Sequence, residues 1–352
     1  MRFLRKMSYG LFAALFMNTI AFANLPYHPI TFPRDEAAHY TNVPYPVTNM
    51  TEWWYYNGKF TTMNDRNFGY CIFYLYAQAA KNGNLVRGPM VYFLLADIDK
   101  QIVYKFLAFD LPITKLNTKN LDLAFGNNFT LQRSPDNRYA FNFHATTENG
   151  SDVQMSLTLE PSFERPVMLN GKTGLINMWN NTNSYYYSRT NLKTINGDFA
   201  IDSDSYKINP AKSLSWMDHQ WGDFMLNPLA HPWVWTSIQL DNGLEMNIMG
   251  KYHPLLNKAD DLAANVFLPN GAQYVYTTQV EYTPAKVESG QFYPESYTVN
   301  IKSLNLSLKL ESLVPGQYIG NTWEGVSSVT GKFQGQPVKG QAYTENTSVH
   351  LQ

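Results

Sequence analysis

The sequence is poor in cysteine and in charge. Its 352 residues include one cysteine, Cys71, so an internal disulfide and a zinc site built of thiolates are both excluded. Cys71 lies inside the apolar run Tyr70–Ala77, which indicates a buried core residue. Charged residues make up only 16% of the chain and form no basic stripe, so we expect no nucleic-acid partner.

Long apolar runs are missing beyond the N-terminus. No later run approaches the roughly 20 residues of a spanning helix, so we expect no membrane span. Residues 1–23 combine a basic start, an apolar stretch and the A-x-A signal at Ala21–Ala23, which predicts a secretory signal peptide, with a membrane anchor as the alternative. Its removal takes away three positive charges and changes the formal charge from −1 to about −4. We therefore expect export to a periplasmic or extracellular space.

Helical periodicity is scarce, and only Lys258–Ala264 is a candidate for a short helix. Aromatic residues make up 15% of the chain, and polar and apolar residues alternate over many short segments. Asn57-Gly58 is a turn or bulge signal within the strand-like stretch Thr51–Phe60. Three hairpins are expected around Glu148–Gly150, Asp241–Gly243 and Pro269–Gly271. This pattern predicts an all-β protein built of barrels or sandwiches.

The chain is too long for one small barrel. A weak internal echo, TEWWYYNGKF at residues 51–60 against HPWVWTSIQL at residues 231–240, favours two barrels. We expect a lead-in segment over 24–50, a first barrel over 51–205 and a second over 206–352. No low-complexity linker separates the halves, so we expect them to pack tightly.

Specific motifs occur in a fixed order: TEWWYYNGKF, SYYYSRTNL, SLSWMDHQWGDF, HPWVWTSIQLDNG and NTWEGVSSVTGKF. Together they resemble the secreted lipocalin-like family of hydroxyneurosporene synthase (carotenoid 1,2-hydratase) and AttH-type proteins. The resemblance implies two tandem lipocalin-like antiparallel β-barrels with an apolar ligand pocket. It also implies protonation and hydration of an isolated double bond, or cyclisation of a polyene. Where relatives usually carry a histidine, this chain has Asn170.

The motif SLSWMDHQWGDF places an acid among tryptophans. In an extended strand Trp216 and Asp218 share one face, while His219 and Trp221 share the other. Glu52 and Glu324 also adjoin tryptophans. Hydration of an unactivated alkene needs a strong proton donor in a dry, aromatic site, and a carboxylic acid kept neutral by burial meets that need. The alternative is a structural anchor, because buried acids routinely accept backbone or indole N–H bonds.

The site residues that we predict fall into two groups. The catalytic candidates are Asp218 as the acid, with Tyr187 and Glu52. The ligand-binding candidates are Trp54, Tyr56, Tyr186, Trp216, Trp235 and Glu324. No cofactor is expected. A metal site from Asp218, His219, Asp223 and His231 lacks any established spacing, so we expect no metal.

The function that we favour is binding of an elongated apolar molecule of lipid, isoprenoid or polyketide type. The sequence leaves open whether hydratase, isomerase or cyclase chemistry through Asp218 accompanies this binding. A non-catalytic carrier or interaction protein is the competing class. Carbohydrate binding is a third class, which predicts exposed, flat Trp or Tyr faces. A serine hydrolase is disfavoured because no G-x-S-x-G occurs.

Overall fold

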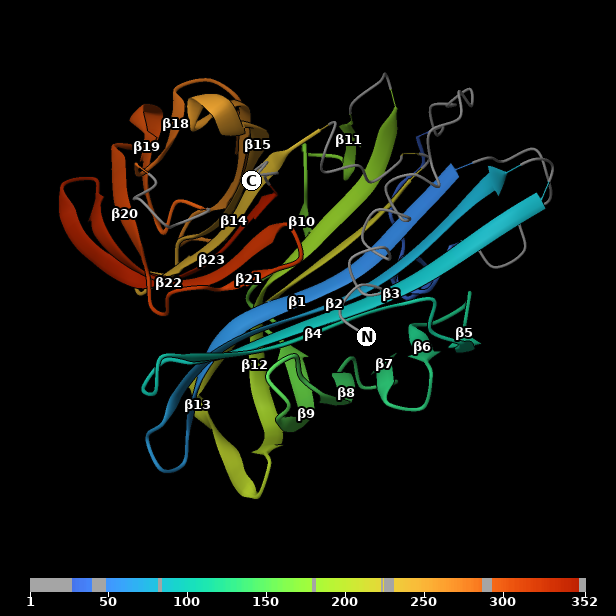
Figure 1. The fold of residues 1–352 in the computed structure, drawn as a ribbon. Coiled ribbons are helices and arrows are strands. Elements are labelled where there is room, and N and C mark those ends of the chain that lie inside the picture. Colours follow the sequence, from blue (N-terminus) through green and yellow to red (C-terminus); the bar gives the residue numbers. More distant parts are fainter. Residues whose placement is uncertain are drawn as a thin grey trace.

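The computed structural model describes residues 27–39, 49–81, 84–178, 182–222, 224, 231–286 and 293–347, so the predicted signal peptide lies outside the described residues. Nearly all of the regular structure is β (Figure 1), as the sequence predicts. The described helices are single 3₁₀ turns, namely η1 (Arg34–Glu36), η3 (Pro254–Leu256) and η4 (Lys302–Leu304).

The first sheet is antiparallel and has 13 strands in the order β4-β3-β2-β1-β13-β12-β9-β8-β7-β6-β5, with β10 and β11 pairing to β12. Its strands are β1 (Asn49–Thr62), β2 (Asn67–Lys81), β3 (Asn84–Asp97), β4 (Ile102–Phe109), β5 (Ile113–Leu116), β6 (Asp122–Phe125), β7 (Phe129–Arg133), β8 (Tyr139–Thr146), β9 (Asp152–Pro161), β10 (Met168–Leu169), β11 (Leu175–Asn177), β12 (Asn183–Ile201) and β13 (Asp204–Gly222).

The second sheet has 10 strands in the order β17-β16-β15-β14-β23-β22-β20-β19-β18, with β21 pairing to β22. Its strands are β14 (Trp233–Leu240), β15 (Glu245–His253), β16 (Lys258–Phe267), β17 (Gln273–Tyr276), β18 (Val280–Pro284), β19 (Ser296–Ile301), β20 (Leu306–Ser312), β21 (Tyr318–Ile319), β22 (Thr322–Phe333) and β23 (Gln336–Thr347). It curls into a nearly closed barrel, whereas the first sheet forms a half-barrel (Figure 1).

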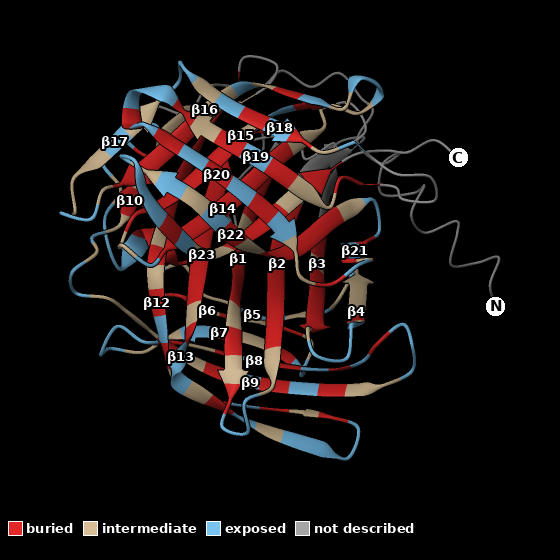
Figure 2. Ribbon diagram, turned by 90° about the vertical axis from the view of Figure 1, so that its left-hand side faces the viewer, coloured by how far each residue is buried: buried red, intermediate tan, exposed pale blue. Residues whose placement is uncertain are grey.

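The long central strands of the first sheet are buried on both faces where the second barrel covers them (Figure 2). One face of β1 and β13 lines the core of the half-barrel, with Trp54 and Met217. The other face, with Tyr55 and Trp216, packs against Trp235 of β14 in a third apolar cluster between the sheets. Burial on both faces explains why these strands are aromatic almost throughout instead of strictly alternating.

Two sequence-based expectations differ from the structure. Asn57-Gly58 forms no turn, because β1 pairs continuously with β2 and β13 through both residues. A Cβ at Gly58 would lie 2.6 Å from the Leu214 carbonyl oxygen, so glycine permits a close strand approach there. The predicted helix at Lys258–Ala264 is part of strand β16, where pairing with β15 overrides local propensity.

The expected boundary between residues 205 and 206 falls inside β13, which begins at Asp204 just after the β12–β13 turn. β13 still belongs to the first sheet, where it pairs with β1 and β12. The chain passes to the second sheet only after Gly222. The tight packing expected between the two halves is present, since Gly69 of β2 contacts Val326 of β22 directly.

The described part of the lead-in segment, residues 27–39, packs into the half-barrel. Asp35 to Ala38 are all buried there. Trp54 Nε1 donates a 2.9 Å hydrogen bond to the Glu36 carbonyl oxygen, and the Ala38 N–H donates to the Asn117 carbonyl oxygen at 3.0 Å. These backbone contacts place ionisable side chains from the segment beside β1 and β13.

Candidate functional site

The strand register separates the predicted site residues onto two faces. β1 and β13 are antiparallel neighbours in which Trp54 lies opposite His219 and Tyr55 lies opposite Asp218. Side chains alternate along a strand, so His219 joins Trp54 inside the half-barrel, while Asp218 faces the second barrel. The predicted division of this motif between two faces is confirmed.

Asp218 is buried between the two sheets and accepts hydrogen bonds from two aromatic residues. Tyr186 of β12 donates its hydroxyl to Asp218 Oδ2 at 2.6 Å, and Trp216 Nε1 donates to Oδ1 at 2.7 Å. Trp235 of β14 donates its indole N–H to the Tyr186 hydroxyl at 2.8 Å. The acid is therefore linked through Tyr186 to the second barrel.

Burial controls the protonation of this cluster. Loss of solvation raises the pKa of Asp218 to about 7, even though hydrogen bonds from Ser188, Tyr186 and Trp216 act to lower it. Burial, together with the Asp218 charge, raises the pKa of Tyr186 well above its usual value. Near pH 7 the carboxyl group exists in both forms, while Tyr186 remains a hydrogen-bond donor.

A chain of amides extends from the Asp218 cluster across the interface. Asn170 Nδ2 donates to Ser188 Oγ at 3.0 Å, and Ser188 is the cross-strand neighbour of Asp218. Asn247 of β15 donates to Asn170 Oδ1 at 2.8 Å, and Asn265 of β16 donates to Asn247 Oδ1 at 2.9 Å. Asn170, which stands where the resemblance suggests histidine, thus lies within the network, but it carries no titratable proton.

Glu324, a predicted ligand-binding residue, belongs to the same aromatic layer. It accepts hydrogen bonds from the hydroxyls of Tyr55, at 2.6 Å, and Tyr92. The Tyr55 ring packs edge-on against Trp235 at 5.5 Å, which connects Glu324 to the Asp218 cluster. Burial raises the pKa of Glu324 well above its usual value and that of Glu345, bonded to Trp233 Nε1 at 2.6 Å, to about 8. Two buried acids, Asp218 and Glu324, therefore share this layer with the partly buried Glu345.

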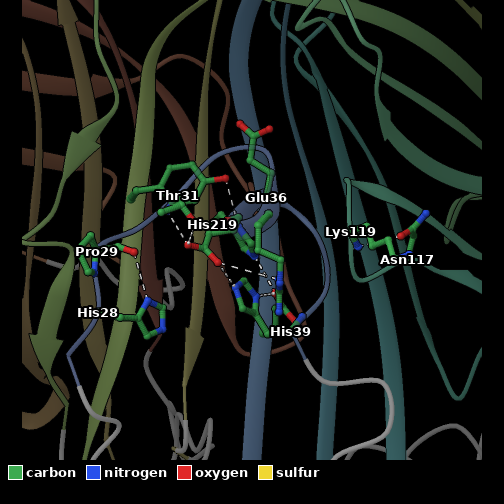
Figure 3. A network of polar contacts seen from close by, with 12 residues as sticks. His28, Pro29, Thr31, Glu36, His39, Asn117, Lys119 and His219 are labelled. Carbon is green, nitrogen blue, oxygen red and sulfur yellow. Dashed lines mark hydrogen bonds and ion pairs between the residues drawn. The ribbon is translucent and has the colours of Figure 1, made fainter.

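The other predicted residues, Glu52, Tyr187, Trp54 and Tyr56, lie on the opposite face, inside the half-barrel. Glu52 Oε1 lies 2.7 Å from His39 Nδ1 and 2.8 Å from His219 Nε2. Figure 3 labels the two histidines, which lie side by side in the half-barrel. Burial acts to raise the pKa of Glu52, but the positive charge of His39 and hydrogen bonds from both histidines outweigh it and lower the pKa to about 2. Glu52 is thus a charged acceptor and is not positioned to act with Asp218.

Sequence reasoning missed the polar residues of the lead-in segment. Glu36 is fully buried and is bonded to Arg133, Arg189 and the Tyr139 hydroxyl. His39 lies beside Glu52. The segment has no periodicity, and the only available signal was the closeness of several ionisable residues between positions 34 and 39.

Comparisons with known proteins identify the family. The sequence model of the AttH-like family matches residues 23–348, so the chain belongs to the AttH-like family. A search of curated proteins found no match. Within the described residues, no helix is long and apolar enough to cross a membrane.

Solved structures share the fold. An AttH candidate from Nitrosomonas europaea aligns with a TM-score of 0.74 and 22% identity, over 92% of this chain and 99% of its own. Kievitone hydratase from Nectria haematococca aligns with a TM-score of 0.68 and 19% identity, over 91% of this chain and 93% of its own. CghA, solved with Sch210972, aligns with a TM-score of 0.50 and 12% identity, over 86% and 89%.

Proposed function

We propose that this chain is an exported enzyme that protonates a carbon–carbon double bond of an apolar small molecule, with Asp218 as the acid. The observation that carries the proposal is a buried carboxyl group, with its pKa raised to about 7, in a layer of tryptophan and tyrosine rings. Such a group is a proton donor near neutral pH in a site that excludes water.

The first step moves one proton and one electron pair. The alkene π pair forms a C–H bond with the proton of Asp218, which leaves a carboxylate on the enzyme and a cation on the substrate. The hydroxyl of Tyr186 and the indole N–H of Trp216 already donate to the two oxygens of Asp218, and they stabilise the new carboxylate. The faces of Trp216 and Trp235 supply π density to the cation.

The second step returns the proton to Asp218. Attack of water on the cation, with loss of one water proton to the carboxylate, gives a hydrated product. Loss of a neighbouring C–H proton to the carboxylate gives an isomer instead, and attack by a second double bond before that loss gives a ring. Both oxygens of Asp218 already accept hydrogen bonds from the protein. A substrate that receives the proton must therefore displace some of the polar side chains around the carboxyl group.

Two further observations support this class over its competitors. One fold neighbour is a hydratase by name, although its 19% identity establishes the shared fold alone. Among the described tryptophans none is exposed, so no flat indole face is offered for carbohydrate stacking there, whereas three tyrosines, Tyr27, Tyr274 and Tyr318, are exposed. A carrier protein needs only an apolar lining and would have no use for a buried proton donor. A carrier function is therefore the alternative that the test below distinguishes.

The test compares small molecules that co-purify with the exported wild-type protein and with Asp218→Asn, by mass spectrometry. We expect an unsaturated apolar compound on the variant and its water adduct, isomer or ring-closed form on the wild type. Adding the variant's compound to wild-type protein in D₂O should place one non-exchangeable deuterium on carbon for a hydrated or isomerised product. The same unchanged compound on both proteins would make the chain a carrier. Glu164→Gln, at an exposed position, is the control.

A further inference from the structure

The polar cluster inside the half-barrel brings together three side chains from separate parts of the chain (Figure 3). His39 comes from the lead-in segment, Glu52 from β1 and His219 from β13. Their ligand atoms, His39 Nδ1, Glu52 Oε1 and His219 Nε2, all lie within 4.8 Å of one another. Glu52 and His219 are fully buried, and the His39 side chain is 7% exposed.

The outer nitrogen of each histidine faces an oxygen of Asp35, which accepts hydrogen bonds. His39 Nε2 lies 3.2 Å from Asp35 Oδ1, and His219 Nδ1 lies 3.1 Å from the Asp35 carbonyl oxygen and 3.3 Å from the Tyr187 hydroxyl. A neutral imidazole that donates from its outer nitrogen directs its lone pair inward. Both inner lone pairs then point toward Glu52 Oε1. In this tautomer three acceptors converge on one small volume, and a bound cation supplies the positive charge that a proton on His39 supplies in the metal-free protein.

We propose that His39 Nδ1, Glu52 Oε1 and His219 Nε2 bind one divalent transition-metal ion, with Zn²⁺ as the representative. Two imidazoles and one carboxylate suit zinc and its first-row neighbours, whereas Mg²⁺ and Ca²⁺ prefer sites made of oxygen alone. Three protein ligands leave one position of a tetrahedral ion open for water or a ligand atom. The ion is placed on the opposite face of the sheet from Asp218, so this site is separate from the proposed catalytic acid.

The surroundings match those of bound metals in proteins. Ligating histidines usually donate their second nitrogen to a carboxylate or a backbone carbonyl, and Asp35 provides both partners here. Aromatic rings fix both imidazole planes. His39 stacks on Trp221 at 4.0 Å between ring centroids, and His219 stacks on Trp54 at 4.8 Å. Asp35 and Glu52 together carry the two negative charges that neutralise a divalent ion.

The spacing needs only a small adjustment. The donor atoms lie 2.7 and 2.8 Å apart in the two histidine–Glu52 pairs. Bonds of about 2.1 Å to an ion hold neighbouring ligand atoms roughly 3.0–3.4 Å apart. The two histidine–Glu52 pairs therefore need to open by less than about 1 Å. The two histidine nitrogens lie within 4.8 Å of each other, and part of their approach falls on His39, which the short lead-in segment carries. Protons alone could hold the same atoms together, and this is the arrangement that the experiment must distinguish from a metal.

The experiment measures metal binding by the purified full protein after treatment with a chelator. Calorimetric titration with Zn²⁺ should give one site per chain, and Co²⁺ should produce a visible absorption band of mixed nitrogen and oxygen ligation. His39→Gln should weaken Zn²⁺ binding by on the order of 100-fold, and Asp35→Asn by about 10-fold to 100-fold, as for other outer-shell partners.

The controls separate this site from the rest of the protein. His253→Gln removes an exposed His–Asp pair and should leave Zn²⁺ binding unchanged. Asp218→Asn should also leave it unchanged, so failure of the proposed enzyme and failure of the metal site are distinguishable. The proposal is overturned if wild-type protein binds no Zn²⁺ and gives no Co²⁺ band, a result that needs no variant. Equal loss of binding in His39→Gln and His253→Gln would overturn it as well.

Discussion

Replacement of Asp218 by asparagine should make the protein's stability less dependent on pH. The folded protein raises the pKa of Asp218 from 3.8 to about 7, because the carboxyl group is buried. An acid whose folded pKa is raised binds its proton more tightly when folded. Its contribution is therefore fully present below the unfolded pKa and decreases as the pH rises through the folded pKa. Asparagine cannot titrate, so the variant lacks this change.

The expected magnitude follows from the shift. At about 1.4 kcal/mol per pKa unit, the wild type should lose roughly 3 kcal/mol of unfolding free energy relative to the variant between pH 4 and pH 7. Any cost of placing an amide beside Tyr186 and Trp216 is independent of pH and cancels in this difference. The window ends at pH 7 because Glu345, whose pKa is raised to about 8, titrates next and interacts with Asp218.

The assay is urea-induced unfolding of both proteins at several pH values, followed by tryptophan fluorescence and by circular dichroism. Coincident transitions by the two signals and equal slopes with urea are needed for the comparison. A difference between wild type and variant that stays constant from pH 4 to pH 7 would mean that Asp218 is charged in the folded protein. The proposed proton donor would then be absent at neutral pH.

Two packing predictions concern other parts of the molecule. Glu36→Gln should lower the unfolding free energy by roughly 3–5 kcal/mol in urea titrations, because it leaves Arg133 and Arg189 without their anion. The control is the surface ion pair between Arg138 and Glu160, where Glu160→Gln should cost less than about 1 kcal/mol. Gly69→Ala should cost about 1–3 kcal/mol, because its Cβ would lie 2.4 Å from Val326 Cγ1. Val326→Ala in the same chain should restore part of that loss, and additive costs would contradict the contact.

The predicted hairpins show how much of the strand structure can be predicted from local sequence. Phe141 and Phe143 alternate with polar residues, and the structure places this alternation on β8, with one face buried. Asn57-Gly58 shows the opposite case. The Asn-Gly dipeptide is a turn signal by itself, yet hydrogen bonding to β2 and β13 on its two sides keeps β1 continuous through it. Propensity acts over a few residues, whereas pairing is decided by the whole sheet.

The candidate site was also predicted only in part, because local alternation gave the faces but not the partners. Alternation alone correctly placed Asp218 and His219 on opposite faces of an extended strand. It could not give the partner of either residue, because those partners come from strands and segments far away in the chain. Tyr186 lies 32 positions from Asp218, and Glu52 lies 167 positions from His219. Glu52 and Asp218 are both acids beside tryptophans, and the sequence motif favoured Asp218 as the proton donor. Only the structure shows that Glu52 is charged, while Asp218, with its pKa raised to about 7, exists in both forms near neutral pH.

The sequence by itself determined the all-β class, the two-barrel plan, the buried character of Cys71 and the two faces of the central motif. The class, the burial of Cys71 and the two faces follow from composition and from a period of two residues, which a local stretch displays. The two-barrel plan follows from chain length, an internal echo and the family resemblance. Only the tertiary structure decided that β13 lies between β1 and β12 in the first sheet, that Asp218 lies between the barrels, and that Asp35 to Ala38 are buried in the half-barrel. Those outcomes depend on which distant surfaces bury one another, and burial is what sets the protonation of each acid.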